Sequence, residues 1–387
     1  MQATTGPDGA SVPPSVPTLA ALPWRRLLAL LIGSRLLIWV CAGVSLLCVA
    51  KGKYYVEHRS PIEWMVRWDA ASFLEIADHG YASPPGAKPN FPFLPLYPLL
   101  VRACSLGGVM NLPLVSQAVS IACLWVSCVL LWRIVVRERG DPKAARLAVA
   151  FLLFGPVSFF FSAPYSEALF LALALGCFDC LRRDRWWAAA LLGALATLTR
   201  FAGLMLIVPL CWQALENAWR TRPNSWPKPA VLVACAAPLL GFMAYCGFLW
   251  VCYGDPLLYF HVELRSWGRC FAWFWLFLAH ESFSGLPVFY QVWFAGSLVT
   301  AFVLLLATVG YRLPTAYPLY GLALISLYIS SRLAEALPRY LSVIFPLYIA
   351  AALICRKWPR LALPALVTSA LLEALSVTLF VNGYWFT

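Results

Sequence analysis

Long apolar stretches without charge recur along this 387-residue chain and constrain its fold more than any other feature. About 20 apolar residues are needed for a helix to cross the hydrocarbon core of a bilayer. The chain is 62% hydrophobic and 12% charged, whereas a soluble protein is about 45–50% apolar and about 25% charged. Within lipid each segment must satisfy its own backbone hydrogen bonds, which favours helices. The sequence therefore predicts an all-α polytopic integral membrane protein, and it excludes a soluble enzyme, a disordered chain and a nucleic-acid binder.

Apolar runs bounded by charges predict a bundle of about eleven transmembrane helices. The segment 186–215 is ambiguous, because it holds either two crossings or one long helix kinked at Arg200. The predicted spans are 27–49, 112–132, 147–163, 166–181, 186–199, 201–215, 230–253, 288–310, 316–330, 341–355 and 361–381.

The distribution of charge predicts the orientation. With the N-terminus in the cytoplasm, short arginine-rich loops fall inside, as the positive-inside rule requires, and these loops account for the net charge of +12. Two longer segments, 51–105 and 254–286, hold eight of the 17 carboxylates, and we assign both segments to the extracytoplasmic or lumenal side. Residues 1–20 are expected to form a disordered cytoplasmic tail, and residues 21–387 a single transmembrane domain with its catalytic loop at 51–105.

The sequence predicts no cofactor and no metal site. Most of the 13 cysteines lie in or beside apolar runs, where a thiol behaves as a small hydrophobic group. Cys177 and Cys180 form a CxxC, but no second CxxC or neighbouring histidine accompanies it, so helix packing explains it better than a metal does.

The first outside segment carries the densest set of polar side chains. In residues 62–79 the apolar positions recur at helical spacing, and Pro61 is suited to open a helix. Such a helix can lie in the interface plane of the membrane. The acids Glu63 and Glu75 are then its solvated face, whereas Asp69, next to Trp68, is a candidate for chemistry.

This segment also carries a family resemblance. RWDAASFLEIADHGY followed by FPFLPLYPLL resembles the signature of the PIG-V family, and further stretches agree in order: FFFSAPYSEALFLAL, ALATLTRFAGLMLIVPL, GDPLLYF with SWGR, and LPRYLSVIFPLY. The resemblance runs over most of residues 27–350. PIG-V proteins are mannosyltransferases of the GT-C superfamily, and the chain is shorter than expected of the eukaryotic members, which indicates a bacterial homologue.

The resemblance implies a chemistry. GT-C enzymes take a sugar from a polyprenyl-phosphate donor, invert the anomeric centre, and use an acid of the first outside loop as general base on the acceptor hydroxyl. Asp69 matches that motif position, and a carboxylate can take the hydroxyl proton as the new bond forms. The leaving phosphate needs positive charge, for which arginine offers a planar set of donors.

Two arginines are the leading candidates for the phosphate. Arg200 stands between apolar stretches, where a charge is costly and calls for a partner; Asp69 or Glu167 would serve as a salt-bridge alternative. Arg339 lies within LPRYL near a helix end, with snorkelling to the headgroups as its alternative, and snorkelling also explains Arg35. Further possible substrate-binding residues are Arg67, Trp68, His79, Tyr81, Tyr165, Glu167, Arg265 and Arg269.

The leading hypothesis is thus a membrane glycosyltransferase that transfers a sugar, with mannose as the expected one, to an extracytoplasmic glycan, glycolipid or protein. Its first rival is a GT-C transferase for another lipid-linked sugar, such as aminoarabinose or glucose. Its second is a lipid or glycolipid transporter, against which the absence of an internal repeat argues. The expected location is the bacterial inner membrane, or the endoplasmic reticulum membrane in a eukaryote; membrane lipids are expected partners, and a protein partner is unspecified.

Overall fold

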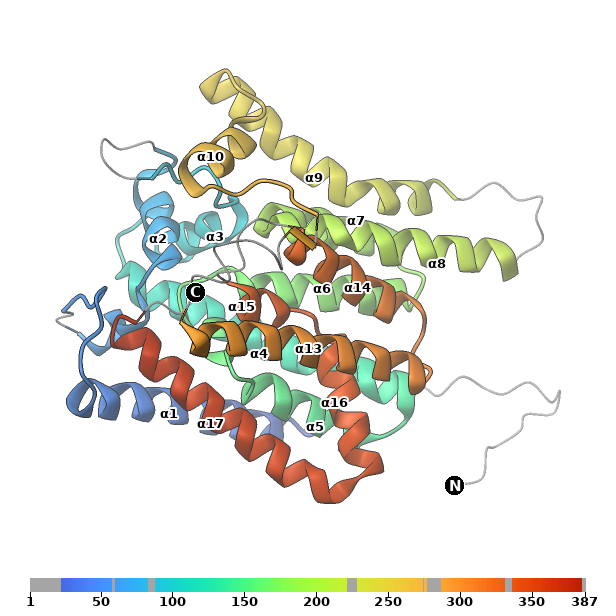
Figure 1. The fold of residues 1–387 in the computed structure, drawn as a ribbon. Helices are drawn as coiled ribbons and strands as arrows, with labels where there is room; N and C mark the ends of the chain where they lie inside the picture. The colour runs from blue at the N-terminus through green and yellow to red at the C-terminus, as the bar shows by residue number, and fades with distance from the viewer. Residues whose placement is uncertain are drawn as a thin grey trace.

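The protein is a bundle of helices in the computed structural model, which describes residues 22–57, 60–82, 88–220, 228–273, 275–276, 287–330 and 336–384 (Figure 1). The predicted tail at 1–20 lies outside the described residues, as do parts of the two predicted outside segments. Six helical stretches in this part of the chain are long and apolar enough to cross a membrane. They are α1 (Trp24–Cys48), α4 (Leu112–Arg139), η4 with α8 (Phe201–Leu206 and Ile207–Arg220), α9 (Pro229–Tyr253), α13 (Val288–Gly310), and η5 with α17 (Pro359–Leu361 and Ala362–Val381).

Shorter helices complete the bundle. α5 (Pro142–Leu153), α6 (Glu167–Leu181), α7 (Trp186–Thr199), α14 (Ala316–Ile329) and α16 (Pro346–Lys357) pack among the long ones, and α6, α7 and α9 form one stack. The all-α membrane class is therefore confirmed. Eleven crossings remains a prediction, because five of the predicted spans fall on these shorter helices.

One predicted span is wrong in its second half. We expected 147–163 to be a single crossing, but α5 ends at Leu153, and the chain continues through Gly155 and Pro156 into the short 3₁₀ helix η3 (Ser158–Phe161). Proline has no N–H to continue the helix and clashes with the preceding turn. The aromatic side chains that follow, Phe159 to Phe161, are nevertheless fully buried.

The ambiguity at 186–215 is resolved in favour of two segments. Helix α7 ends at Thr199, Arg200 is extended (φ −151°, ψ 141°), and η4 follows. The chain turns back tightly here, because a Cβ at Gly203 would stand 2.3 Å from the backbone nitrogen of Thr197. The break places Arg200 between two helices instead of within one.

The helix predicted at 62–79 is also interrupted. Pro61 opens only the 3₁₀ helix η2 (Pro61–Met65), and α2 (Asp69–His79) begins anew after Trp68, whose φ is +54°. A positive φ is unusual for a bulky residue and signals backbone strain. The turn makes Asp69 the first residue of α2. Helix α3 (Leu96–Cys104) follows and packs on α2.

Arg35 does not snorkel, contrary to the prediction. Its guanidinium is buried and donates to the carbonyls of Leu153 and Ser158 and to the hydroxyls of Ser158 and Ser162, at 2.8–3.0 Å. Its Nη2 also lies 3.8 Å from Oε1 of the buried Glu373 on α17. The prediction of snorkelling was wrong because the irregular stretch after α5 leaves backbone carbonyls free to accept from Arg35. In a continuous helix these carbonyls would accept from the helix's own N–H groups.

The described loops rich in arginine gather at the end of the bundle where α8 ends and α9 begins, and α2, α3 and α10 (Leu258–Trp267) lie toward the other end (Figure 1). At the arginine-rich end acids pair with the cations. Asp179 is surrounded by Arg133, Arg137 and Arg183, and Glu138 binds Arg182.

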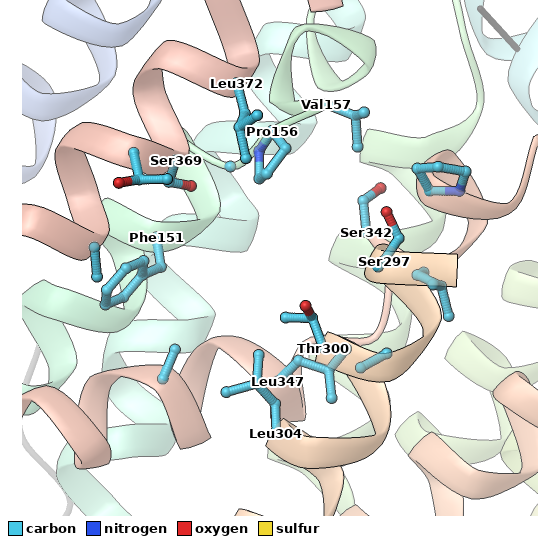
Figure 2. A pocket seen from close by; sticks show the side chains of 18 of the residues that line it. Phe151, Pro156, Val157, Ser297, Thr300, Leu304, Ser342, Leu347, Ser369 and Leu372 are labelled. Atoms are coloured by element: carbon cyan, nitrogen blue, oxygen red, sulfur yellow. The ribbon is translucent and has the colours of Figure 1, made fainter. Parts of the chain in front are cut away.

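A cavity of about 900 Å³ lies between α13, α16 and α17. Its wall is mainly apolar, with scattered hydroxyls such as Ser297, Thr300 and Ser369 (Figure 2). One side is formed by the short helix α15 (Leu337–Leu341), which contributes Pro338 and Leu341.

Candidate active site

A second cavity, of about 790 Å³, lies on the opposite side of α15 and is far more polar. Elements distant in sequence build it: α2, η4, α10, α14 and α15. Its polar and charged lining includes Asp69, Ser166, Thr199, Arg200, Glu263, Trp267, Arg269, Tyr328, Arg339 and Tyr340. We refer to it as the polar cavity.

Asp69 enters the polar cavity from the first turn of α2. A carboxylate at a helix N-terminus is favoured by the free N–H groups and the helix dipole. Its Oδ2 lies 2.7 Å from Nη2 of Arg339. Burial acts to raise the pKa of Asp69, but the nearby charges of Arg339, Arg269 and Arg200 outweigh it and hold that pKa below its ordinary value.

Arg339 projects from α15 and is only 4% exposed, so the snorkelling alternative is wrong for it. The guanidinium lies over the rings of Tyr165 and Tyr340, at 5.2 and 5.1 Å, an arrangement that favours a cation. Its Nε lies 3.4 Å from Oε1 of Glu167, whereas Nη1 has no hydrogen-bond partner among the described residues. The side chain thus retains a donor for a further anion.

Arg200 shares Glu167 with Arg339. Its Nη1 lies 2.6 Å from Oε1 of Glu167 and 3.1 Å from Oγ of Ser166. The salt bridge to Glu167, which the sequence left open, is therefore present. A single buried carboxylate at the start of α6 holds two arginines beside the polar cavity.

Arg269 is the third cation of the polar cavity. Its Nη1 lies 3.8 Å from Oε1 of Glu263, and its guanidinium lies 6.0 Å from the ring of Tyr340. Arg269 is one of the residues predicted from the sequence, whereas Glu263, Trp267 and Tyr340 are not. In the sequence, the stretches GDPLLYF and SWGR mark this region only as part of the family resemblance.

Other predicted site residues lie elsewhere. His79 and Arg265 are exposed and do not line the polar cavity. The Tyr81 hydroxyl donates to the carbonyl of Phe93 at 2.7 Å and the Tyr165 hydroxyl to that of Arg67 at 2.8 Å, both as structural contacts.

Arg67 and Trp68 directly precede Asp69 in the chain but do not line the polar cavity. The Arg67 guanidinium lies 5.4 Å from the ring of Tyr55, and burial lowers the pKa of Arg67. Trp68 positions Asp69 through its strained backbone. Among the described residues no group of three or more histidine, cysteine, aspartate or glutamate side chains is arranged to hold a metal ion.

Fold and site together define a polytopic, all-helical membrane protein with a charged cavity built on its shorter helices. The structure is similar to the crystal structure of ArnT from Cupriavidus metallidurans bound to undecaprenyl phosphate, with a TM-score of 0.56 and 13% sequence identity. The match covers 94% of this chain and 77% of that one.

The chain belongs to the mannosyltransferase (PIG-V) family, whose model matches residues 44–264. It is 36% identical over 153 residues to GPI alpha-1,6-mannosyltransferase 2 of Cricetulus griseus, which covers 36% of this chain and 30% of that protein. It is 26% identical over 233 residues to GPI mannosyltransferase 2 of Schizosaccharomyces pombe, covering 55% of this chain and 49% of the relative. The aligned parts thus span half or less of these relatives.

Proposed function

We propose that the protein is a glycosyltransferase that transfers mannose from a polyprenyl-phosphate donor to an acceptor hydroxyl, with inversion and with Asp69 as general base. The observation that carries the proposal is the polar cavity, where the partly buried carboxylate of Asp69 lies near three arginines. Family membership supports the sugar, and the fold neighbour, solved with undecaprenyl phosphate, supports a lipid-phosphate donor.

The reaction is a single displacement. The acceptor oxygen forms a bond to the anomeric carbon while the bond from that carbon to the phosphate oxygen breaks, and the electron pair of the broken bond stays on the polyprenyl phosphate. The hydroxyl proton passes to Asp69 as the new bond forms. Inversion follows because the acceptor attacks the face opposite the leaving group, as in inverting hydrolysis where water is the nucleophile.

The arginines serve the leaving group. Phosphate gains negative charge as the glycosidic bond breaks, and donors already fixed in place stabilise that charge without reorganisation. Arg200 and Arg339 are held by Glu167 and by aromatic rings, and the free Nη1 of Arg339 provides a donor. Arg269 completes the set from the α10 side.

Donor binding also prepares the base. In the free protein Arg339 holds Asp69 in an ion pair and lowers its pKa, which makes the carboxylate a weak proton acceptor. A phosphate beside Arg339 competes for the guanidinium, and the added negative charge raises the pKa of Asp69. The base thus gains proton affinity when the donor is in place.

We further propose that the polar cavity lies on the extracytoplasmic or lumenal face, opposite the arginine-rich end of the bundle. The charge asymmetry of the two ends supports this orientation. The acceptor is a glycan, glycolipid or protein on that face.

The decisive experiment measures transfer from radiolabelled polyprenyl-phosphate mannose in membranes that contain the protein. Asp69→Asn is compared with the wild type and with Asp78→Asn, a change at an exposed acid of the same helix. We expect label in an acceptor fraction for the wild type and Asp78→Asn, and loss of nearly all transfer for Asp69→Asn. Equal transfer by all three proteins contradicts the base, and transfer only from a donor with another sugar contradicts mannose.

A further inference from the structure

The wall of the polar cavity on the α10 side carries buried polar atoms without partners. Oε2 of Glu263 and the indole Nε1 of Trp267 have no hydrogen-bond partner among the described residues, and the same is true of the Tyr328 hydroxyl on α14. Native proteins rarely leave such groups unpaired, because each one costs its desolvation free energy. Three such atoms around one cavity indicate a ligand that supplies both donors and acceptors.

The Glu263 carboxylate excludes phosphate as a common partner of these three atoms. A carboxylate accepts hydrogen bonds and repels an anion, so Glu263 needs a donor from the ligand. The Trp267 indole offers only a donor, and the Tyr328 hydroxyl offers either. A sugar hydroxyl both donates and accepts, so a polyhydroxylated ring satisfies all three groups at once.

The position of these groups relative to the arginines fits a sugar joined to a phosphate. Glu263 reaches Arg269 at 3.8 Å with Oε1 and leaves Oε2 unpartnered. Lys88 and Arg269 lie over the Trp267 ring at 4.3 and 5.9 Å, so cations already contact the ring and its N–H edge offers the remaining contact.

We infer that Glu263 and Trp267 form the sugar subsite of the polar cavity and bind hydroxyls of the transferred pyranose. Neither residue belongs to the set that the sequence singled out, and the inference rests on the proposed function because it takes the sugar donor from it. Burial raises the pKa of Glu263, partly offset by Arg269. Burial of the charged Glu263 carboxylate costs desolvation free energy, and a hydroxyl of the bound sugar provides the hydrogen-bond donor that Oε2 lacks.

The test compares two lipids that differ only in the sugar. Purified protein in nanodiscs is titrated with polyprenyl-phosphate mannose and with polyprenyl phosphate. The variants are Glu263→Gln and Trp267→Phe, and the controls Glu216→Gln and Trp187→Phe, which remove a carboxylate and an indole N–H far from the cavity. We expect Glu263→Gln and Trp267→Phe to weaken binding of the mannosyl lipid about 10- to 100-fold. Binding of the lipid without sugar should change by less than about twofold, as in both controls.

Each other result overturns the inference in a distinct way. Equal weakening of both lipids assigns Glu263 to the positioning of Arg269, and unchanged binding of both shows that the side chains do not contact the sugar. Trp267→Phe keeps an aromatic side chain without the indole N–H, and it provides the test if Glu263→Gln does not fold. If the wild type binds neither lipid, the donor in the proposed function is wrong and the inference falls with it, whereas wild-type binding without the expected discrimination overturns the subsite alone.

Discussion

Nη2 of Arg339 lies 2.7 Å from Oδ2 of Asp69, so the short helix α15 and the first residue of α2 are joined by an ion pair. The pair joins α15 to α2 across 270 positions of sequence and stands at the wall of the polar cavity. The strength of this ion pair depends on the geometry of the guanidinium and on its charge. Substitution by lysine changes the geometry alone, and substitution by glutamine removes the charge.

Arg339→Lys keeps the charge but loses the planar set of donors that can hold Asp69 and a phosphate together. We expect kcat/KM to fall at least about 10-fold, because lysine does not replace arginine at a site of this geometry. Steady-state kinetics with the lipid donor measure the loss. Arg312→Lys, a change at an exposed arginine, serves as control and should retain wild-type kinetics.

Arg339→Gln should move the pH dependence of activity. Arg339 is the nearby charge that lowers the pKa of Asp69 most, so that pKa rises without it, and a higher pH is needed to ionise the base. The acid limb of the kcat/KM profile should shift upward by about one pH unit or more. An unchanged limb would mean that another group is titrating.

Glu263→Gln should not destabilise the protein at neutral pH. The pKa of Glu263 is raised in the folded state, so its contribution to stability decreases as the pH rises from the unfolded pKa through the folded one. We expect a Tm equal to the wild type or about 1–3 °C higher at pH 7.5, with the difference smaller at pH 5. Thermal unfolding in detergent at both pH values measures it, and a markedly lower Tm at pH 7.5 argues for a structural role.

Arg35→Met should damage the fold instead of the chemistry. It leaves Glu373 and the carbonyls of Leu153 and Ser158 without their buried cation, and breaking such a network costs about 3–5 kcal/mol. We expect a large drop in thermal stability in detergent. The double change Arg35→Met with Glu373→Leu removes the orphaned acid and should recover part of the loss, whereas no recovery contradicts the coupling.

Gly203→Ala should disturb the break at Arg200. The added Cβ would stand 2.3 Å from the Thr197 nitrogen, so the backbone must move, and Arg200 with it. We expect lower stability and weaker donor binding. Gly247→Ala, at an open position in α9, is the matched control and should be neutral or slightly stabilising.

Much of this architecture could be predicted from the sequence, for a physical reason. Uncharged apolar runs such as 230–253 and 288–310 are stable in lipid as helices, because a helix satisfies its own backbone hydrogen bonds. The bounds of α9 and α13 agree with these two predicted spans to within one residue. Asp69, Arg200, Arg339 and Arg269 were predicted because charges near membrane depth are costly or because they match a family motif.

The rest depends on contacts that no local pattern encodes. The acceptors that bury Arg35 exist only because Gly155 and Pro156 end α5, and the role of Glu263 depends on how α10 meets α2 and α15. His79 is close to Asp69 in sequence, but it lies at the far end of α2 and points to solvent. Proximity along the chain was a poor guide where a helix separates two residues by several turns.

Helix α15 is five residues long, yet it borders both cavities. Arg339 and Tyr340 face the polar side, whereas Pro338, Leu341 and the following Ser342 face the apolar side. Neighbouring positions of this helix therefore line different cavities. A substitution scan along it compares the two environments within one and a half helical turns, with every variant sharing the same backbone.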